Sequence, residues 1–69
     1  MANQACVRSA LITVFNNQPF RYAGRWVCPH EDFPPDRLQC LASFLLSQHY
    51  EKLRVDQRVN LHSVLGIDL

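Results

Sequence analysis

The sequence predicts an α+β fold, in which an N-terminal antiparallel β-hairpin packs on two C-terminal α-helices (ββαα) in one small domain. Three observations predict it: a segment at 20–28 in which side chains alternate between two faces, a proline-rich connection at 29–35, and apolar residues at helical spacing after it. A chain of 69 residues is long enough for one domain only, 1–69. Its composition, 48 % hydrophobic and 19 % charged, is typical of a globular protein.

The first strand of the hairpin has a sequence pattern that fits two kinds of secondary structure. Residues 6–15 carry apolar side chains on both faces, and their spacing fits a strand and a helix equally well. The β-branched run at 12–14 and the polar turn at 16–19 favour a strand. We therefore expect a hairpin over about 6–28, while the choice between strand and helix at 6–15 stays open.

The second strand, at 20–28, has two chemically different faces. One face holds Phe20, Tyr22, Gly24, Trp26 and Cys28, and the other holds Arg21, Ala23, Arg25 and Val27. We expect Tyr22 and Trp26 to form the packing centre under the first helix, which leaves Arg21 and Arg25 available on the reverse face. Gly24 indicates a bulge or a close packing partner.

Two helices follow the loop at 29–35. The first spans about 36–53, with Asp36 near its positive end and an apolar stripe of Leu38, Leu41, Ala42, Leu45, His49 and Leu53. The second spans about 56–65, with Asp56 as its N-cap and Gly66 as its C-cap. The junction between them has neither glycine nor proline, so one long kinked helix is the alternative.

Charge and cysteine usage narrow the class of protein. The formal net charge is +1, whereas a general nucleic-acid binder normally has a strong basic excess. Three cysteines at irregular spacing do not make a disulfide framework. The chain opens without a basic and apolar signal segment, and its apolar runs are too short to span a membrane. We expect a cytoplasmic protein with no membrane partner.

Candidate residues for metal binding or catalysis do not form a recognisable motif. Cysteines and histidines that zinc can use are Cys28, His30, Cys40, His49 and His62, but the usual paired spacings are missing. A zinc-stabilised domain is therefore the third hypothesis, and the sequence leaves open whether Cys28, His30 and Cys40 bind metal. No glycine-rich phosphate loop is present. We expect no enzyme, no catalytic residues, no cofactor and no metal site.

The main alternative function is a small DNA-binding transcriptional regulator that uses the C-terminal helix. That helix carries polar side chains suited to base edges, namely Gln57, Arg58, Asn60, His62 and Ser63. A stable helix-turn-helix normally needs a third helix, which the predicted order of elements lacks. The near-neutral charge also disfavours DNA, so nucleic acid is the second choice of partner.

The preferred function is a non-enzymatic protein-binding module. The first helix has more apolar surface than one hairpin covers, and surplus apolar surface marks interfaces. Tyrosine and arginine are enriched at binding hot spots. The predicted protein-binding residues are Arg21, Arg25, Phe44, Leu46, His49, Tyr50, Arg54 and Arg58. The expected partners are a host or cognate protein and a second copy of the chain, since a homodimer would complete the core.

In size and type, the chain resembles small proteins encoded by phages or mobile elements that bind and inhibit a host machine, such as anti-CRISPR or anti-activator proteins. The resemblance has no residue-level motif and transfers no site. It implies an inhibitor that occupies a surface of a larger host protein or complex.

Overall fold

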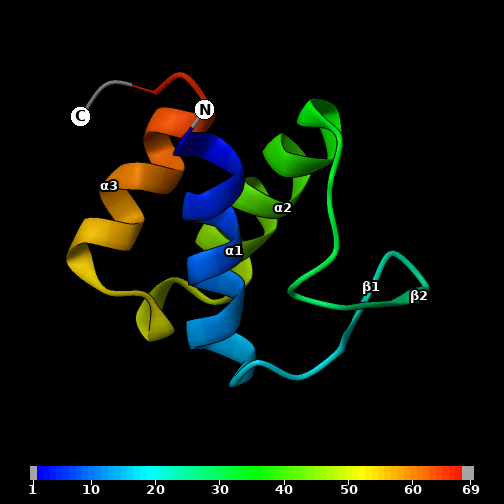
Figure 1. Ribbon diagram of the computed structural model, residues 1–69. Coiled ribbons are helices and arrows are strands. Elements are labelled where there is room, and N and C mark those ends of the chain that lie inside the picture. Colours follow the sequence, from blue (N-terminus) through cyan, green and yellow to red (C-terminus); the bar gives the residue numbers. More distant parts are fainter. Residues whose placement is uncertain (1, 68–69) are drawn as a thin grey trace.

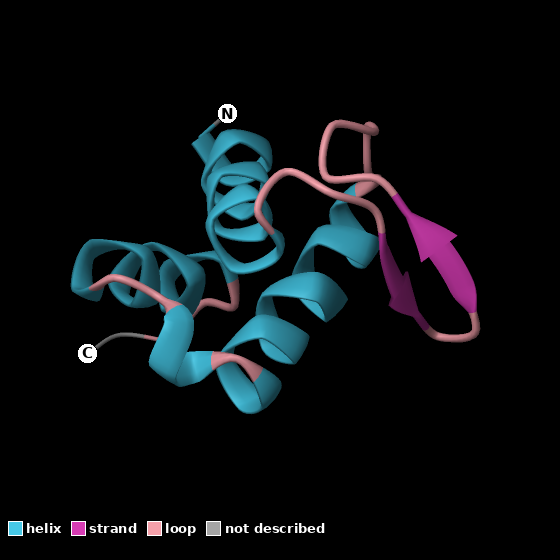
Figure 2. Ribbon diagram, turned by 90° about the horizontal axis from the view of Figure 1, so that it is seen from below, coloured by secondary structure: helices cyan, strands magenta, loops and turns pink. Residues whose placement is uncertain are grey.

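In the computed structural model, which describes residues 2–67, three α-helices pack against one another and a short β-hairpin extends from one side (Figures 1 and 2). The order of elements is α1 (Ala2–Phe15), β1 (Phe20–Tyr22), β2 (Arg25–Val27), α2 (Pro35–Gln48), the 3₁₀ helix η1 (Tyr50–Lys52) and α3 (Val55–Val64). The α+β class and the hairpin are confirmed. The order ββαα is wrong in detail, because a helix precedes the hairpin.

The segment at 6–15 lies in helix α1 and is not a strand. Val7, Ala10 and Leu11 follow helical spacing, and all three are fully buried against the other helices. The packing of this stripe outweighs the strand preference of the β-branched residues, since tertiary context overrides propensity. Asn16 adopts a left-handed conformation with φ 55°, and the Asn17 N–H donates to the Ile12 carbonyl at 3.1 Å. The polar turn at 16–19 therefore ends a helix.

The hairpin is shorter than predicted and turns within the segment that was expected to be one strand. Ala23 and Gly24 have φ 51° and 80°, which is the geometry of a two-residue type I′ turn. Gly24 supplies this backbone conformation, and the bulge or close packing partner predicted for it is wrong: a Cβ there would meet nothing within 4 Å.

The turn changes which side chains share a face. In the observed register Arg21 pairs with Trp26 and Tyr22 pairs with Arg25. Cross-strand partners lie on the same face of a sheet, so Trp26 lies beside Arg21 and not beside Tyr22. The prediction that Trp26 is a packing centre is wrong, because 63 % of Trp26 is exposed. Phe20 is the buried aromatic of the hairpin instead.

Helix α2 begins at Pro35, where the missing N–H of proline leaves no hydrogen bond unmade, and Asp36 lies in its first turn as predicted. It ends at Gln48 and not at residue 53 as predicted, because His49 caps α2 and the chain continues in the separate helix η1. The alternative of one long kinked helix is also wrong, because the chain is extended at Leu53 and Arg54 before α3 starts.

Helix α3 matches the predicted span to within one residue at each end. Its N-cap is Arg54 and not Asp56: the Arg54 backbone N–H donates to the Gln57 side-chain oxygen at 3.0 Å. At the other end the C-cap is Leu65 and not the predicted Gly66, which follows it with φ 76°. The Ile67 N–H donates to the His62 carbonyl at 2.9 Å, which completes a Schellman motif.

One hydrophobic core joins all parts of the fold. Its buried members are Val7, Ala10, Leu11, Phe20, Val27, Phe33, Leu38, Leu41, Ala42, Leu45, Leu53, Leu61 and Val64. Phe44 and Leu46 pack against it as partly buried side chains. The apolar surface of α2, which was predicted to be in surplus and free for a partner, is therefore largely covered by α1 and the hairpin.

Candidate protein-binding surface on the hairpin

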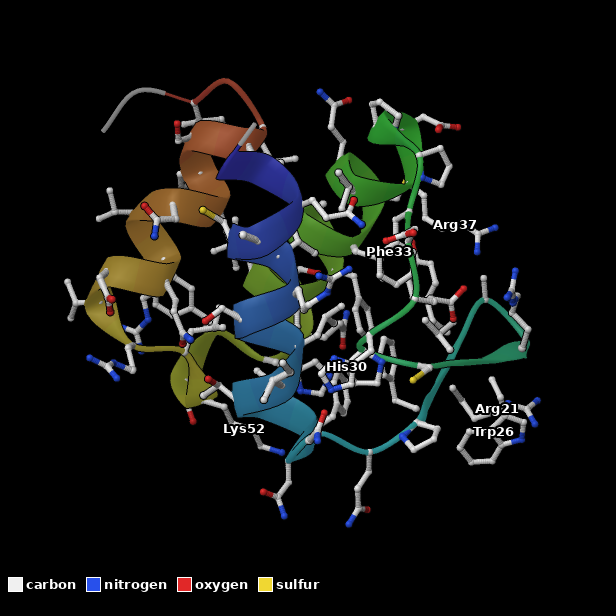
Figure 3. The ribbon with its side chains drawn as sticks, viewed as in Figure 1. Arg21, Trp26, His30, Phe33, Arg37 and Lys52 are labelled. Atoms are coloured by element: carbon white, nitrogen blue, oxygen red, sulfur yellow. The ribbon has the colours of Figure 1, made fainter. Side chains whose placement is uncertain are left out.

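Trp26 is the largest exposed apolar side chain among the described residues. It is the only tryptophan of the chain, and 63 % of it is accessible to solvent. The guanidinium carbon of Arg21, on the paired strand, lies 5.5 Å from the centroid of the ring. Figure 3 shows the two side chains together on the side of the hairpin that points away from the helices. A cation held over a ring in this way is a cation–π pair. We call the side of the hairpin that carries these two side chains the Arg21–Trp26 face.

The positive charge of this face is not neutralised within the described part of the chain. Arg21 forms no ion pair there, and its one hydrogen bond is a 3.5 Å contact to the Gly24 carbonyl. Arg25, the other arginine of the hairpin, lies 3.6 Å from the Glu31 carboxylate. The second oxygen of the same carboxylate accepts the Cys28 N–H at 2.9 Å. The two arginines that the sequence grouped together therefore differ in their availability.

The opposite face of the hairpin is anchored by aromatic packing. The members of this aromatic cluster are Phe15, Phe20, Tyr22, Phe44 and His49. Ring centroids are 4.2 Å apart for Phe15 and Phe20, and 4.9 Å apart for Tyr22 and Phe44. The cluster connects the hairpin to the end of α1 and to α2. Because it holds one face in place, the other face projects from a fixed support.

His49 completes the aromatic cluster at the end of α2. Its ring meets those of Phe15 and Phe44 edge-on, at centroid distances of 5.1 and 5.2 Å. Burial lowers the pKa of His49 below its ordinary 6.5, and the nearby positive charge of Lys52 lowers it further. His49 is thus a packing residue that favours its neutral form.

The predicted site residues on α2 and beyond are dispersed. Leu46 packs on the core. Tyr50 is 46 % exposed, with the Arg58 guanidinium 4.1 Å above its ring and the Arg58 Nε–H donating to its backbone carbonyl at 3.1 Å. Arg54 is exposed and lies 3.5 Å from the Asp56 carboxylate. The structure brings together Tyr50 with Arg58, and Phe44 with His49, but it does not join these pairs to the arginines of the hairpin by any ion pair or hydrogen bond between described residues.

A shallow hollow lies at the corner between α2 and α3. It is lined by the single segment 47–52 and has a volume of about 270 Å³. Pockets for drug-sized ligands usually measure about 300–1,000 Å³ and bury most of the ligand. The hollow is smaller than that, and one continuous segment does not surround a ligand.

The side chains of α3 that were expected to read DNA bases are largely engaged in the fold. Gln57 is buried, and its amide donates to the Thr13 hydroxyl at 2.9 Å. Arg58 lies on Tyr50. The His62 Nδ1–H donates to the Arg58 carbonyl at 2.7 Å. Of the five residues named, Asn60 and Ser63 are the exposed ones.

Metal-ligating groups do not converge in the described part of the chain. No set of three or more His, Cys, Asp or Glu side chains there could hold a metal ion. The three cysteines are free thiols, with Cys28 and Cys40 exposed and Cys6 partly buried. His30 is hydrogen-bonded to the side-chain oxygen of Asn17, which ties the loop after the hairpin to the end of α1.

None of the described helices is long and apolar enough to pass through a membrane. Comparison of the chain with protein-family models, with curated proteins and with solved structures finds no match. The functional argument therefore rests on the residues themselves.

Sequence reasoning placed Arg21 in the site but missed Trp26 as its neighbour. The signal that could have found the pair is Ala23-Gly24 between two short runs of strand-forming residues, which is the length of a two-residue hairpin turn. Placing the turn there makes Arg21 and Trp26 cross-strand partners.

Proposed function

We propose that this protein is a small non-enzymatic module that binds a larger host or cognate protein through the Arg21–Trp26 face. The observation that carries the proposal is the 63 % exposure of Trp26 next to Arg21, which forms no ion pair with any described residue. Tryptophan and arginine are the residue types that most often dominate protein-binding energies. Since the opposite face of the hairpin is packed in the aromatic cluster, a partner can cover Trp26 without disturbing the core.

The size of the molecule limits how such a module acts. A standard interface buries about 800 Å² on each partner, which is about a fifth of the 4481 Å² that this molecule exposes. A hairpin of two three-residue strands supplies only part of that area. The partner therefore either also contacts neighbouring residues such as Arg25 or binds transiently. Occupation of a partner's surface, as an inhibitor does, is the mode of action we propose.

One feature of the structure supports the alternative of a DNA-binding regulator, and another disfavours it. Helix α1 packs on α2 and α3 and supplies the third helix that a helix-turn-helix needs. However, the exposed part of α3 includes Val55 and Val59, 72 % and 51 % exposed, and the acidic Asp56. Apolar and acidic side chains are poorly suited to a phosphate backbone. We keep DNA binding as the second candidate.

Self-association has lost its original argument. A homodimer was expected to cover surplus apolar surface on the predicted helix at 36–53, which is α2 in the structure. Helix α1 of the same chain packs on that surface instead. A second copy remains one of the partners that the experiment below can detect.

The experiment is photo-crosslinking in cells of the source organism. A photoreactive phenylalanine analogue replaces Trp26 in one variant and Val55, an exposed residue of α3, in the matched control. We expect a protein adduct from position 26 that disappears when Arg21→Gln is added, and no such adduct from position 55. An adduct with DNA from position 55, or a protein adduct from position 55 alone, contradicts the proposal.

A further inference from the structure

We infer that the Arg21–Trp26 face recognises an acidic protein segment in which an aspartate or glutamate stands beside an apolar residue. The inference rests on the proposed function and names the chemistry of its partner. The carboxylate would pair with the Arg21 guanidinium, and the apolar side chain would cover the Trp26 ring.

The charge of the hairpin supports an acidic partner. Residues 19–28 contain two arginines and no acidic residue. The first acidic residue after them, Glu31, is already bound by Arg25 and by the Cys28 N–H. The guanidinium of Arg21 thus remains the uncompensated charge of this face. A partner carboxylate supplies the counter-ion that the described chain does not.

The geometry of the pair supports a contact that is both polar and apolar. The Arg21 guanidinium carbon lies 5.5 Å from the centroid of the Trp26 ring, and one terminal nitrogen makes the 3.5 Å contact to the Gly24 carbonyl. The remaining N–H groups lie in the plane of the guanidinium and are available to a partner. The edge of this plane matches the two oxygens of a carboxylate, which accept two parallel hydrogen bonds. Trp26 remains 63 % exposed with Arg21 over its ring, so an apolar side chain can still cover it.

The distribution of cations favours a protein segment over single-stranded nucleic acid, which also stacks on tryptophan. A nucleic-acid groove presents several cations along the path of the backbone. Among the described residues, Arg37, Lys52 and Arg58 also form no ion pair, and the Arg58 guanidinium lies over the Tyr50 ring. Figure 3 shows Arg37 and Lys52 apart from the Arg21–Trp26 pair, on α2 and on η1. One free cation beside one ring suits a single carboxylate better than a chain of phosphates.

A displayed library of random peptides tests the inference with the intact protein. The library is selected on the immobilised wild-type protein, and peptides that also bind the Trp26→Ala variant are removed. The affinities of the retained peptides are then measured for the wild type, for Arg21→Gln and for Arg37→Gln. Arg37→Gln is the matched control, because it removes one unpaired positive charge at a distance from Trp26. Circular dichroism confirms that each variant is folded.

The expected result is enrichment of aspartate or glutamate next to aromatic or aliphatic residues. Arg21→Gln should then weaken binding by about tenfold or more, as expected for a charge-assisted hydrogen bond, while Arg37→Gln leaves it nearly unchanged. Arg21→Lys should fall between them, because lysine keeps the charge and loses the fork.

Three results overturn the inference. The acidic partner is rejected if the retained peptides are not enriched in acidic residues, or if their affinity falls equally in Arg21→Gln and Arg37→Gln. Either outcome leaves the crosslinking result and the proposed function intact. If an oligothymidylate probe binds and its binding depends on both Arg21 and Trp26, the partner of this face is single-stranded nucleic acid and not a protein segment. Recovery of no peptide that depends on Trp26 rejects a linear segment, and a protein adduct at position 26 would then indicate a folded surface as the partner.

Discussion

The two faces of the hairpin, although built from the same two short strands, have opposite environments. On one face Phe20 and Val27 are cross-strand partners with exposures of 5 % and 1 %. On the other face the partners Arg21 and Trp26 extend into solvent. An isolated two-stranded hairpin is marginal in water, so the aromatic cluster on the first face is needed to hold the second face in a defined position. The comparison teaches that a core residue and an exposed residue of a small hairpin, here Phe20 and Arg21, can be adjacent along the chain.

The largest expected effect comes from removing the anchor. Phe20→Ala should destabilise the protein by about 3–5 kcal/mol, through lost burial and a cavity in the core. A core of this size supplies about 3–5 kcal/mol in total, so the variant should be largely unfolded at room temperature. Urea denaturation followed by circular dichroism measures the loss. If Phe20→Ala proves as stable as the wild type, the packed face is not the anchor of the hairpin.

The turn that separates the two faces is expected to contribute the next largest effect. Gly24 has φ 80°, and a Cβ at this position would meet no neighbour. Gly24→Ala should therefore cost about 1–2 kcal/mol through backbone strain alone. Ala23→Asn is the opposing control, because Asn-Gly is the preferred pair in a type I′ turn and should raise stability slightly. Thermal melting of both variants tests the turn, and equal shifts for the two would contradict it.

A smaller, pH-dependent effect is expected from His49 in the aromatic cluster. Its pKa is lowered in the folded state, so the unfolded chain takes up a proton more readily. The stability that depends on neutral His49 is complete above pH 6.5 and is lost as the pH falls through and below that value. Denaturation of the wild type and of His49→Leu between about pH 7 and 5 should show a steeper fall for the wild type. A steeper fall for the variant would refute the assigned direction.

The smallest effect on stability is expected at the exposed face. Trp26→Ala should change the free energy of unfolding by at most about 1 kcal/mol, the usual range for an exposed cross-strand or cation–π pair. This variant sharpens the comparison with Phe20→Ala, because both remove an aromatic ring from the same hairpin. A loss as large as that of Phe20→Ala, measured in the same urea titration, would place Trp26 in the core.

Much of the helical part could be predicted from the sequence, because its signals are local. Apolar spacing located the buried face of α2, and Gly66 indicated by its residue type that α3 ends next to it, although the C-cap itself is Leu65. Helix α1 was not predicted, since period alone does not separate helix from strand in an apolar segment. Only packing against α2 and α3 decides between them.

The candidate site was predictable only in part for a different reason. Arg21 was named from its residue type, but its neighbour depends on where the chain turns. The turn uses Ala23 at φ 51°, a conformation that alanine adopts rarely, so residue preference did not indicate it. An error in the position of one turn moved Trp26 from the exposed face to the core.

The measurement that most directly tests the division between the two faces is quenching of the single tryptophan. Iodide and caesium are added separately to the folded protein at equal ionic strength, and the fluorescence of Trp26 is recorded. We expect strong quenching by iodide, weaker quenching by caesium because Arg21 repels it, and a smaller difference between the two ions in Arg21→Gln than in Arg37→Gln. Emission that both ions fail to quench until the protein unfolds would show that Trp26 is buried, and would contradict the account.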